Sequence, residues 1–258
     1  METQLSKTKQ GSTNRQPRPA NIRVKRALWL CALGLALGLF GAGSVANAGT
    51  PSPSQKKVQS ASSQYANSNS TKILRAGAAA AAKGDFLKTV ALWHPLAEDG
   101  NASAQFGLGL IYRQGGGTMV ERDQERAHQL FTKAGAQGHV RALFQLGVGY
   151  ERGLGTKKDT QKALFFYRLA AAAHNIAAQF NLAILLGKAT PNAEKSTKNI
   201  GQAYKWALIA QRQAKQKPTT PALSSRINNI VMILAPQTSF AQRQKAQRAA
   251  RILLGQQL

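Results

Sequence analysis

The chain has 258 residues, and 35 Lys and Arg against 10 Asp and Glu give it a net charge of +25. A hydrophobic content of 43% is ordinary for a globular protein, so part of the chain can bury a core. The charge favours anionic partners, such as acidic proteins, lipid headgroups, acidic polymers or nucleic acid. The only cysteine, Cys31, lies in an apolar run, which excludes a disulfide framework and a thiolate metal site from the rest of the chain.

The first 48 residues carry the three parts of a secretory signal. Residues 1–26 hold seven Lys and Arg and one Glu, an uncharged run follows, and Ala46-Asn47-Ala48 supplies a small-x-small exit. This pattern predicts a signal peptide with its apolar part in residues 27–48, cleaved after Ala48 and with Ala46 as the second small residue. The apolar run is also long enough to span a bilayer, so an uncleaved membrane anchor is the alternative.

Both alternatives predict the same topology. Because Lys and Arg remain on the cytoplasmic side of a membrane segment, we expect the chain after Ala48 to lie outside the cytoplasm, either periplasmic or anchored at the inner membrane. This location argues against cytoplasmic nucleic acid as a partner. A further hypothesis is that translation starts near Val24, because the basic segment before the apolar run would then have the length that is usual in a signal peptide. Residues 49–71 are rich in Ser, Gln, Asn and Pro, and we expect a disordered linker there.

Residues 72–212 repeat a pattern of helix pairs every 36 to 38 residues. The first helices have small or apolar residues at i, i+4, i+7 and i+8, in the sets Ala104, Leu108, Ile111, Tyr112; Ala142, Leu146, Gly149, Tyr150; and Ala178, Leu182, Leu185, Leu186. The second helices have them at i, i+3, i+4 and i+7, in the sets Thr89, Leu92, Trp93, Leu96; Ala127, Leu130, Phe131, Ala134; Ala163, Phe166, Tyr167, Ala170; and Ala203, Trp206, Ala207, Ala210. One pair cannot cover its own apolar face, so the pattern predicts a stacked solenoid.

The loops of the pattern also repeat. Glycines in residues 115–117 and 153–155 follow first helices, where we expect left-handed caps. Asp123 and Asp159 precede second helices, where a carboxylate accepts hydrogen bonds from unpaired amides.

The segments WHPLAEDGNASAQFGLGLIYRQG (93–115) and ALFQLGVGYERGLGTKKDTQKALFFYRLAAAA (142–173) resemble Sel-one-like repeats, relatives of the tetratricopeptide repeat. The shared marks are Ala-x-x-x-Leu-Gly-x-x-Tyr, Gly-x-Gly and the Asp before the second helix. The resemblance covers about residues 75 to 212 and implies a right-handed α/α superhelical solenoid of three to four pairs that acts as an adaptor or scaffold. The third repeat departs from it, with Ala183 in place of Gly and residues 187–199 in place of Gly-x-Gly and Asp.

Residues 213–258 are predicted to form a basic capping region, because the sequence from residue 233 to 254 resembles the helix that closes such arrays. In this helix Ala246, Ala249, Ala250 and Leu253 share one face. Residues 195–258 contain eleven Lys and Arg and no acid. A solvated outer face and an anion-binding end are both compatible with that pattern. The candidate anion-binding residues are Arg243, Lys245, Arg248 and Arg251.

Residues of the types that enzymes use do not form a catalytic pattern. His94, His128, His139 and His174 have no metal-ligand spacing, and His139 matches Asn101 and Asn175 at the junctions between repeats. No Ser lies in a nucleophile elbow, and the glycine loops lack the Lys-Ser/Thr of a phosphate loop. We therefore predict no catalytic, cofactor-binding or metal-binding residue.

The sequence favours a non-enzymatic scaffold of the cell envelope that binds a protein or peptide on its helical surface. Its candidate contacts are aromatic residues that can also belong to the core, namely Trp93, Tyr112, Tyr150 and Trp206. The alternative is a binder of anionic envelope polymers or of the membrane surface through the basic C-terminal region.

Overall fold

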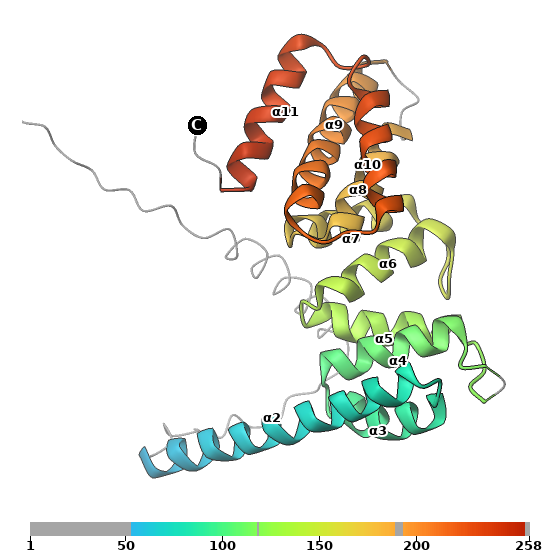
Figure 1. Cartoon of the computed structure of the whole chain (residues 1–258), viewed down its shortest axis with the longest axis vertical. Coiled ribbons are helices and arrows are strands. Elements are labelled where there is room, and N and C mark those ends of the chain that lie inside the picture. The colour runs from blue at the N-terminus through green and yellow to red at the C-terminus, as the bar shows by residue number, and fades with distance from the viewer. Residues whose placement is uncertain (1–52, 118, 189–192, 256–258) are drawn as a thin grey trace, which may run out of the picture.

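The computed structural model describes residues 53–117, 119–188 and 193–255, with side chains for residues 68–117, 119–188 and 199–255 (Figure 1). The candidate cleavage residues Ala46 and Ala48 and the apolar run before them lie outside these ranges. The described residues contain ten helices and no strand. In the same part of the chain, no helix is long and apolar enough to cross a membrane.

The ten helices follow one another through short turns. Their bounds are α2 Pro53–Ala82, α3 Phe86–Glu98, α4 Ala102–Gln114, α5 Gln124–Ala136, α6 Val140–Arg152, α7 Thr160–Ala172, α8 Ile176–Lys188, α9 Ala193–Gln216, α10 Pro221–Leu234 and α11 Phe240–Leu253. Each helix from α2 to α9 packs against the next one along the chain, so that four pairs stack from α2–α3 to α8–α9 (Figure 1). Helices α10 and α11 both pack against α9. The predicted all-helical solenoid is confirmed.

The aspartate caps and the glycine that ends α6 agree with the predicted caps, whereas Gly115 ends α4 with φ 79° and ψ 151°, which is not the left-handed helical conformation. The carboxylates of Asp123 and Asp159 accept hydrogen bonds from the amides of Arg126 and Lys162, at 2.8 and 2.9 Å. Asp85 caps α3 in the same way and was not predicted. Gly153 ends α6 in the left-handed conformation, with φ 73° and ψ 38°. Such a φ strains residues with a Cβ, which explains the repeated glycine.

The linker predicted for residues 49–71 is wrong from residue 53 onward, because α2 begins at Pro53. Proline is well suited to the first turn of a helix, where its missing amide hydrogen is not needed. Further along α2, Gly77 and Ala80 are buried against α3, and the alanines of residues 78–82 favour helix. A helix anchored at that end can extend backward along the chain.

The predicted capping region contains two helices instead of one. Thr220 caps the start of α10, Pro221 occupies its first turn, and Ile227 and Leu234 are buried. The apolar residues of α10 include the unbroken run 230–234, which hides the helical period in the sequence. The closing helix itself is confirmed as α11, which buries Ala246 and Ala250 against the rest of the C-terminal end.

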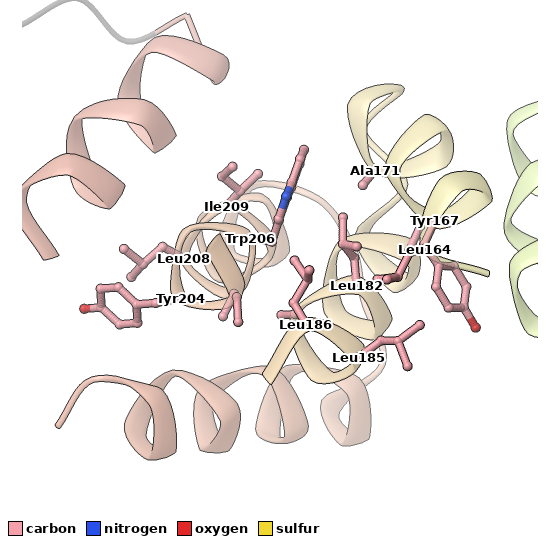
Figure 2. Close-up of a cluster of buried hydrophobic side chains, with 14 of the residues drawn as sticks. Leu164, Tyr167, Ala171, Leu182, Leu185, Leu186, Tyr204, Trp206, Leu208 and Ile209 are labelled. Atoms are coloured by element: carbon pink, nitrogen blue, oxygen red, sulfur yellow. The ribbon is translucent and has the colours of Figure 1, made fainter. Parts of the chain in front are cut away.

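Most residues that the repeat pattern selected are buried, whereas Leu92, Trp93, Leu130, Tyr150 and Phe166 are half-buried. Ala104, Ala142 and Ala178 are completely buried at one position in the first helices. The largest cluster joins α7, α8 and α9, and Figure 2 shows Leu182 and Leu186 of α8 lying between Tyr167 and Trp206. Burial of each large apolar side chain contributes roughly 1.5–3 kcal/mol to stability.

Glycines let large rings pack directly on the backbone of the first helices. The ring of Phe131 lies against Gly109 and the ring of Tyr167 lies against Gly147, and neither site has room for a Cβ. The third repeat has Ala183 at the glycine position and Ala207 at the ring position, and both are completely buried. The departure of Ala183 from the repeat pattern is therefore accompanied by a smaller partner residue.

Candidate functional site

The junction residues between repeats are helix caps. The side-chain oxygens of Asn101 and Asn175 accept hydrogen bonds from the amides of Ala104 and Ala178, at 3.0 and 2.9 Å. Nδ1 of His139 accepts one from the amide of Ala142 at 3.2 Å, in agreement with its predicted junction role.

His139 also stacks on Phe106, with ring centroids 4.5 Å apart. Burial and the nearby charge of Arg141 lower the pKa of His139, which favours the neutral imidazole that can accept the hydrogen bond.

Tyr167 ties three consecutive helices together. Its hydroxyl donates a hydrogen bond to Oε2 of Glu151 in α6 at 2.6 Å and accepts one from Nδ2 of Asn181 in α8 at 3.2 Å. Burial and the Glu151 carboxylate raise the pKa of Tyr167, so the hydroxyl remains protonated. The residue has a structural role, and the sequence pattern identified its ring without these polar partners.

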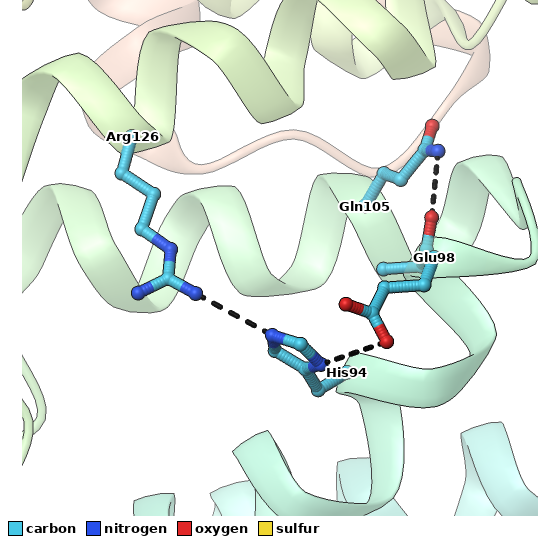
Figure 3. A network of polar contacts seen from close by, with 5 residues as sticks. His94, Glu98, Gln105 and Arg126 are labelled. Atoms are coloured by element: carbon cyan, nitrogen blue, oxygen red, sulfur yellow. Dashed lines mark hydrogen bonds and ion pairs between the residues drawn. The ribbon is translucent and has the colours of Figure 1, made fainter.

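A polar network connects α3 and α5 at the surface (Figure 3). Nδ1 of His94 lies 3.3 Å from Oε2 of Glu98, and Nε2 of His94 lies 3.5 Å from a guanidinium nitrogen of Arg126. The imidazole of His94 therefore lies between a carboxylate and a guanidinium. Nearby, the amide of Gln105 donates to the carbonyl of Ala97 at 2.9 Å and fixes the end of α3.

The network borders a hollow of about 170 Å³ between α3, α4 and α5, which we call the α3–α5 hollow. Its apolar surface comes from Leu108, Tyr112 and Leu130, and its polar rim comes from His94, Glu98, Arg126, Gln129 and Lys133. The guanidinium of Arg126 lies 4.2 Å from the ring centroid of Tyr112, a cation–π contact that holds it over the hollow. A wider, open depression shares Tyr112 and Arg126 and continues to the exposed Leu87 and Met119.

The α3–α5 hollow has the chemistry of a recognition surface. It combines an apolar floor with both signs of charge, and it includes no Ser or Cys that could act as a nucleophile. Within the described ranges, no group of three or more His, Cys, Asp and Glu could hold a metal ion. Sequence analysis missed the hollow because its residues come from three helices. The spacing of His94 and Glu98 on α3 was the only local signal.

The four candidate aromatic contacts do not come together. Tyr112 lies in the α3–α5 hollow, although only 8% of it is exposed. Nε1 of Trp93 donates to the carbonyl of Leu74 at 3.2 Å, and Trp206 is part of the large core cluster.

The remaining candidate, Tyr150, stacks on Phe166 with ring centroids 5.5 Å apart. It also meets the edge of His128, with ring centroids 5.0 Å apart. Tyr112 is thus the one candidate of the four that lines a described hollow.

The four candidate anion-binding residues divide into two kinds. Nη1 of Arg243 donates to the carbonyls of Ala235 and Thr238, both at 2.9 Å, so this residue closes the turn between α10 and α11. Lys245, Arg248 and Arg251 are exposed along α11.

Comparison with known proteins identifies the repeats. The model of the Sel1 repeat matches residues 102–139, 140–175 and 176–213, which contain the pairs α4–α5, α6–α7 and α8–α9. No curated protein matches the sequence.

The solved structures that this chain is similar to have low sequence identity to it. A protective antigen of uropathogenic Escherichia coli with an SLR fold, c5321, is 22% identical over 75% of this chain, with a TM-score of 0.42. This chain spans about half of that protein, 47% of its length. A Sel1 repeat protein from Oxalobacter formigenes is 23% identical over 64% of this chain and 70% of that one, with a TM-score of 0.44.

Proposed function

Since residues 102–213 form three Sel1 repeats, this chain is a Sel1-like helical repeat protein, and we propose that it is a non-enzymatic scaffold of the cell envelope. Sel1 repeats generally mediate binding of protein partners. In this chain, the binding surface is the α3–α5 hollow, which receives a segment of a partner protein. The signal pattern of residues 1–48 supports the envelope location.

The single observation that carries the proposal is the composition of the α3–α5 hollow. Its apolar floor suits one large apolar side chain of a partner, while Arg126 and Lys133 on the rim suit an acidic neighbour. Tyr112 and Arg126 are residue types that often dominate binding energy at interfaces, and their cation–π contact orders them before a partner arrives. The hollow therefore fits an apolar–acidic segment.

Capture of partners from envelope extract tests this proposal. The full chain is immobilised and compared with the double variant Arg126→Glu/Lys133→Glu, and the column is washed at low and then at high salt. A matched control, Lys157→Glu/Arg168→Glu, makes the same change of charge at exposed residues outside the hollow. We expect the parent and the control to retain one defined protein at high salt and the hollow variant to lose it. Equal retention by all three chains, or complete elution by salt, contradicts the proposal.

A further inference from the structure

Three large apolar side chains are exposed where α10 turns into α11. Met232 is 72% exposed, Ile233 is 56% exposed and Phe240 is 70% exposed. We call residues 232–240 the α10–α11 tip. Of the seven large hydrophobic residues exposed in the described part of the chain, these three are the only ones that occur within nine residues of one another. Exposed apolar side chains gathered at one place indicate an interaction surface.

The α10–α11 tip is an ordered turn. Besides the two hydrogen bonds from Arg243, the hydroxyl of Thr238 donates to the carbonyl of Ala235 at 2.8 Å. Ser239 and Gln242 form a reciprocal capping box at the start of α11. Because the backbone of the turn is satisfied internally, the fold itself holds Met232, Ile233 and Phe240 outward.

The charged residues of α10 and α11 are all cations. Residues 195–258 contain no acid, and Lys245 and Arg248 are exposed on the helix that begins at Phe240. With a rise of 1.5 Å per residue, these two residues follow Phe240 by about 8 and 12 Å along α11. An anionic partner therefore meets exposed cations on α11 close to the apolar side chains.

We propose that the α10–α11 tip docks on the surface of an anionic lipid bilayer. Met232, Ile233 and Phe240 enter the boundary between headgroups and acyl chains, while Lys245 and Arg248 contact lipid phosphates. A soluble acidic polymer would be held by the cations alone and would leave the three apolar side chains in water. The bilayer interface accommodates both, so the observations favour it.

This docking leaves the proposed partner site accessible. In Figure 1 the turn between α10 and α11 lies at the top of the view, whereas α3, α4 and α5 lie toward the bottom. The inference is independent of the scaffold proposal, because it uses other residues at the other end of the repeats.

A fluorescent label at Met232 tests the docking. The full chain with Cys31→Ser carries Met232→Cys or, as a control, Met119→Cys, each labelled with an environment-sensitive dye. Met119 is 68% exposed but lies beside Glu121 and Asp123 in the loop between α4 and α5. Both chains have the same N-terminal apolar run, so its attachment to vesicles affects them equally.

The labelled chains are added to vesicles of phosphatidylcholine with and without phosphatidylglycerol. We expect the emission of the dye at position 232 to shift to the blue on anionic vesicles only, and to be quenched there by bromine atoms in the lipid acyl chains. We expect neither change for the dye at position 119. Lys245→Glu/Arg248→Glu is expected to raise the lipid concentration for half-maximal shift at least tenfold, since each cation near the surface contributes about fivefold. Phe240→Ser is expected to raise it about tenfold.

Two results overturn the proposal. One is that the label at position 232 stays in water on anionic vesicles. This result overturns the proposal even if the chain binds dextran sulfate, a soluble acidic polymer, through Lys245 and Arg248. The other is an equal shift at positions 232 and 119, which would assign the contact to the N-terminal run.

Discussion

The first two Sel1 repeats and the third fill the same helical positions with different side chains. In the first two, Phe131 and Tyr167 pack on Gly109 and Gly147. In the third, alanine occupies both positions, and the helix pair is covered by α10 and α11 instead. The comparison teaches that the two positions vary together, because a Cβ at the first position and a ring at the second would occupy the same space in a close-packed core.

The two regions also differ in how their helices begin. Asp85, Asp123 and Asp159 cap α3, α5 and α7, whereas Thr220 and Ser239 cap α10 and α11. Hydroxyl and carboxylate caps satisfy the same amides, but only the carboxylate adds negative charge. The C-terminal end therefore has capped helices and remains free of acid, as docking on an anionic surface requires.

The largest expected effect separates the two kinds of repeat. Tyr167→Ala removes a completely buried ring and is expected to lower the free energy of unfolding by about 3–5 kcal/mol. At the equivalent position of the third repeat, Ala207→Gly is expected to cost only about 1 kcal/mol, through helix propensity. Urea denaturation measures both, and equal losses would remove the distinction between the repeats.

Substitution of the glycine tests the same difference between the repeats. Gly147→Ala places a Cβ against the Tyr167 ring and is expected to cost about 1–3 kcal/mol. The double variant Gly147→Ala/Tyr167→Ala is expected to lose less free energy of unfolding than the sum of the two single losses. The reason is that the alanine at position 147 fills part of the space that the ring leaves. Strictly additive costs in a double-mutant cycle would show that the two positions are independent.

The cations of the C-terminal end are expected to differ from one another. Arg243→Gln removes two hydrogen bonds to the carbonyls of Ala235 and Thr238, and it is expected to cost about 1–2 kcal/mol. Arg248→Gln changes an exposed side chain and is expected to stay within about 0.5 kcal/mol of the parent. Thermal unfolding distinguishes the two, and a similar melting temperature for both variants would contradict the role of Arg243 in the turn.

The smallest effect concerns His139, where the first two repeats meet. Its folded-state pKa lies below the ordinary value of 6.5, so the unfolded chain binds a proton first as the pH falls. The stability due to this group is present above pH 6.5 and is lost as the pH falls toward the lower folded pKa. His139→Asn keeps a cap of the type found at Asn101 and Asn175 and is expected to flatten the pH dependence of the melting temperature. An unchanged slope would contradict the neutral cap.

The sequence predicted the parts of the structure that depend on neighbours along one helix. Ala104, Ala142 and Ala178 are completely buried, and the caps at Asp123 and Asp159 form as expected. These features follow from helical periodicity and local hydrogen bonds, which a single repeat contains.

The features that were missed depend on contacts between helices. The hydrogen bonds of Tyr167 join three helices, and the α3–α5 hollow is also lined by three. Helix α2 was taken for a linker because the packing of Gly77 and Ala80 against α3 is not visible in the polar residues before them. Local propensity is weak information where tertiary packing decides the conformation.

Site-specific photocrosslinking in cells tests the central claim, binding of a protein partner in the α3–α5 hollow, most directly. A photoreactive residue replaces either Gln129, which lines the hollow, or Thr132, which is exposed on the same helix outside it. The account predicts that irradiation gives one discrete protein adduct with the residue at position 129 and none at position 132. Adducts of equal yield at both positions, or an adduct at position 132 alone, would contradict it.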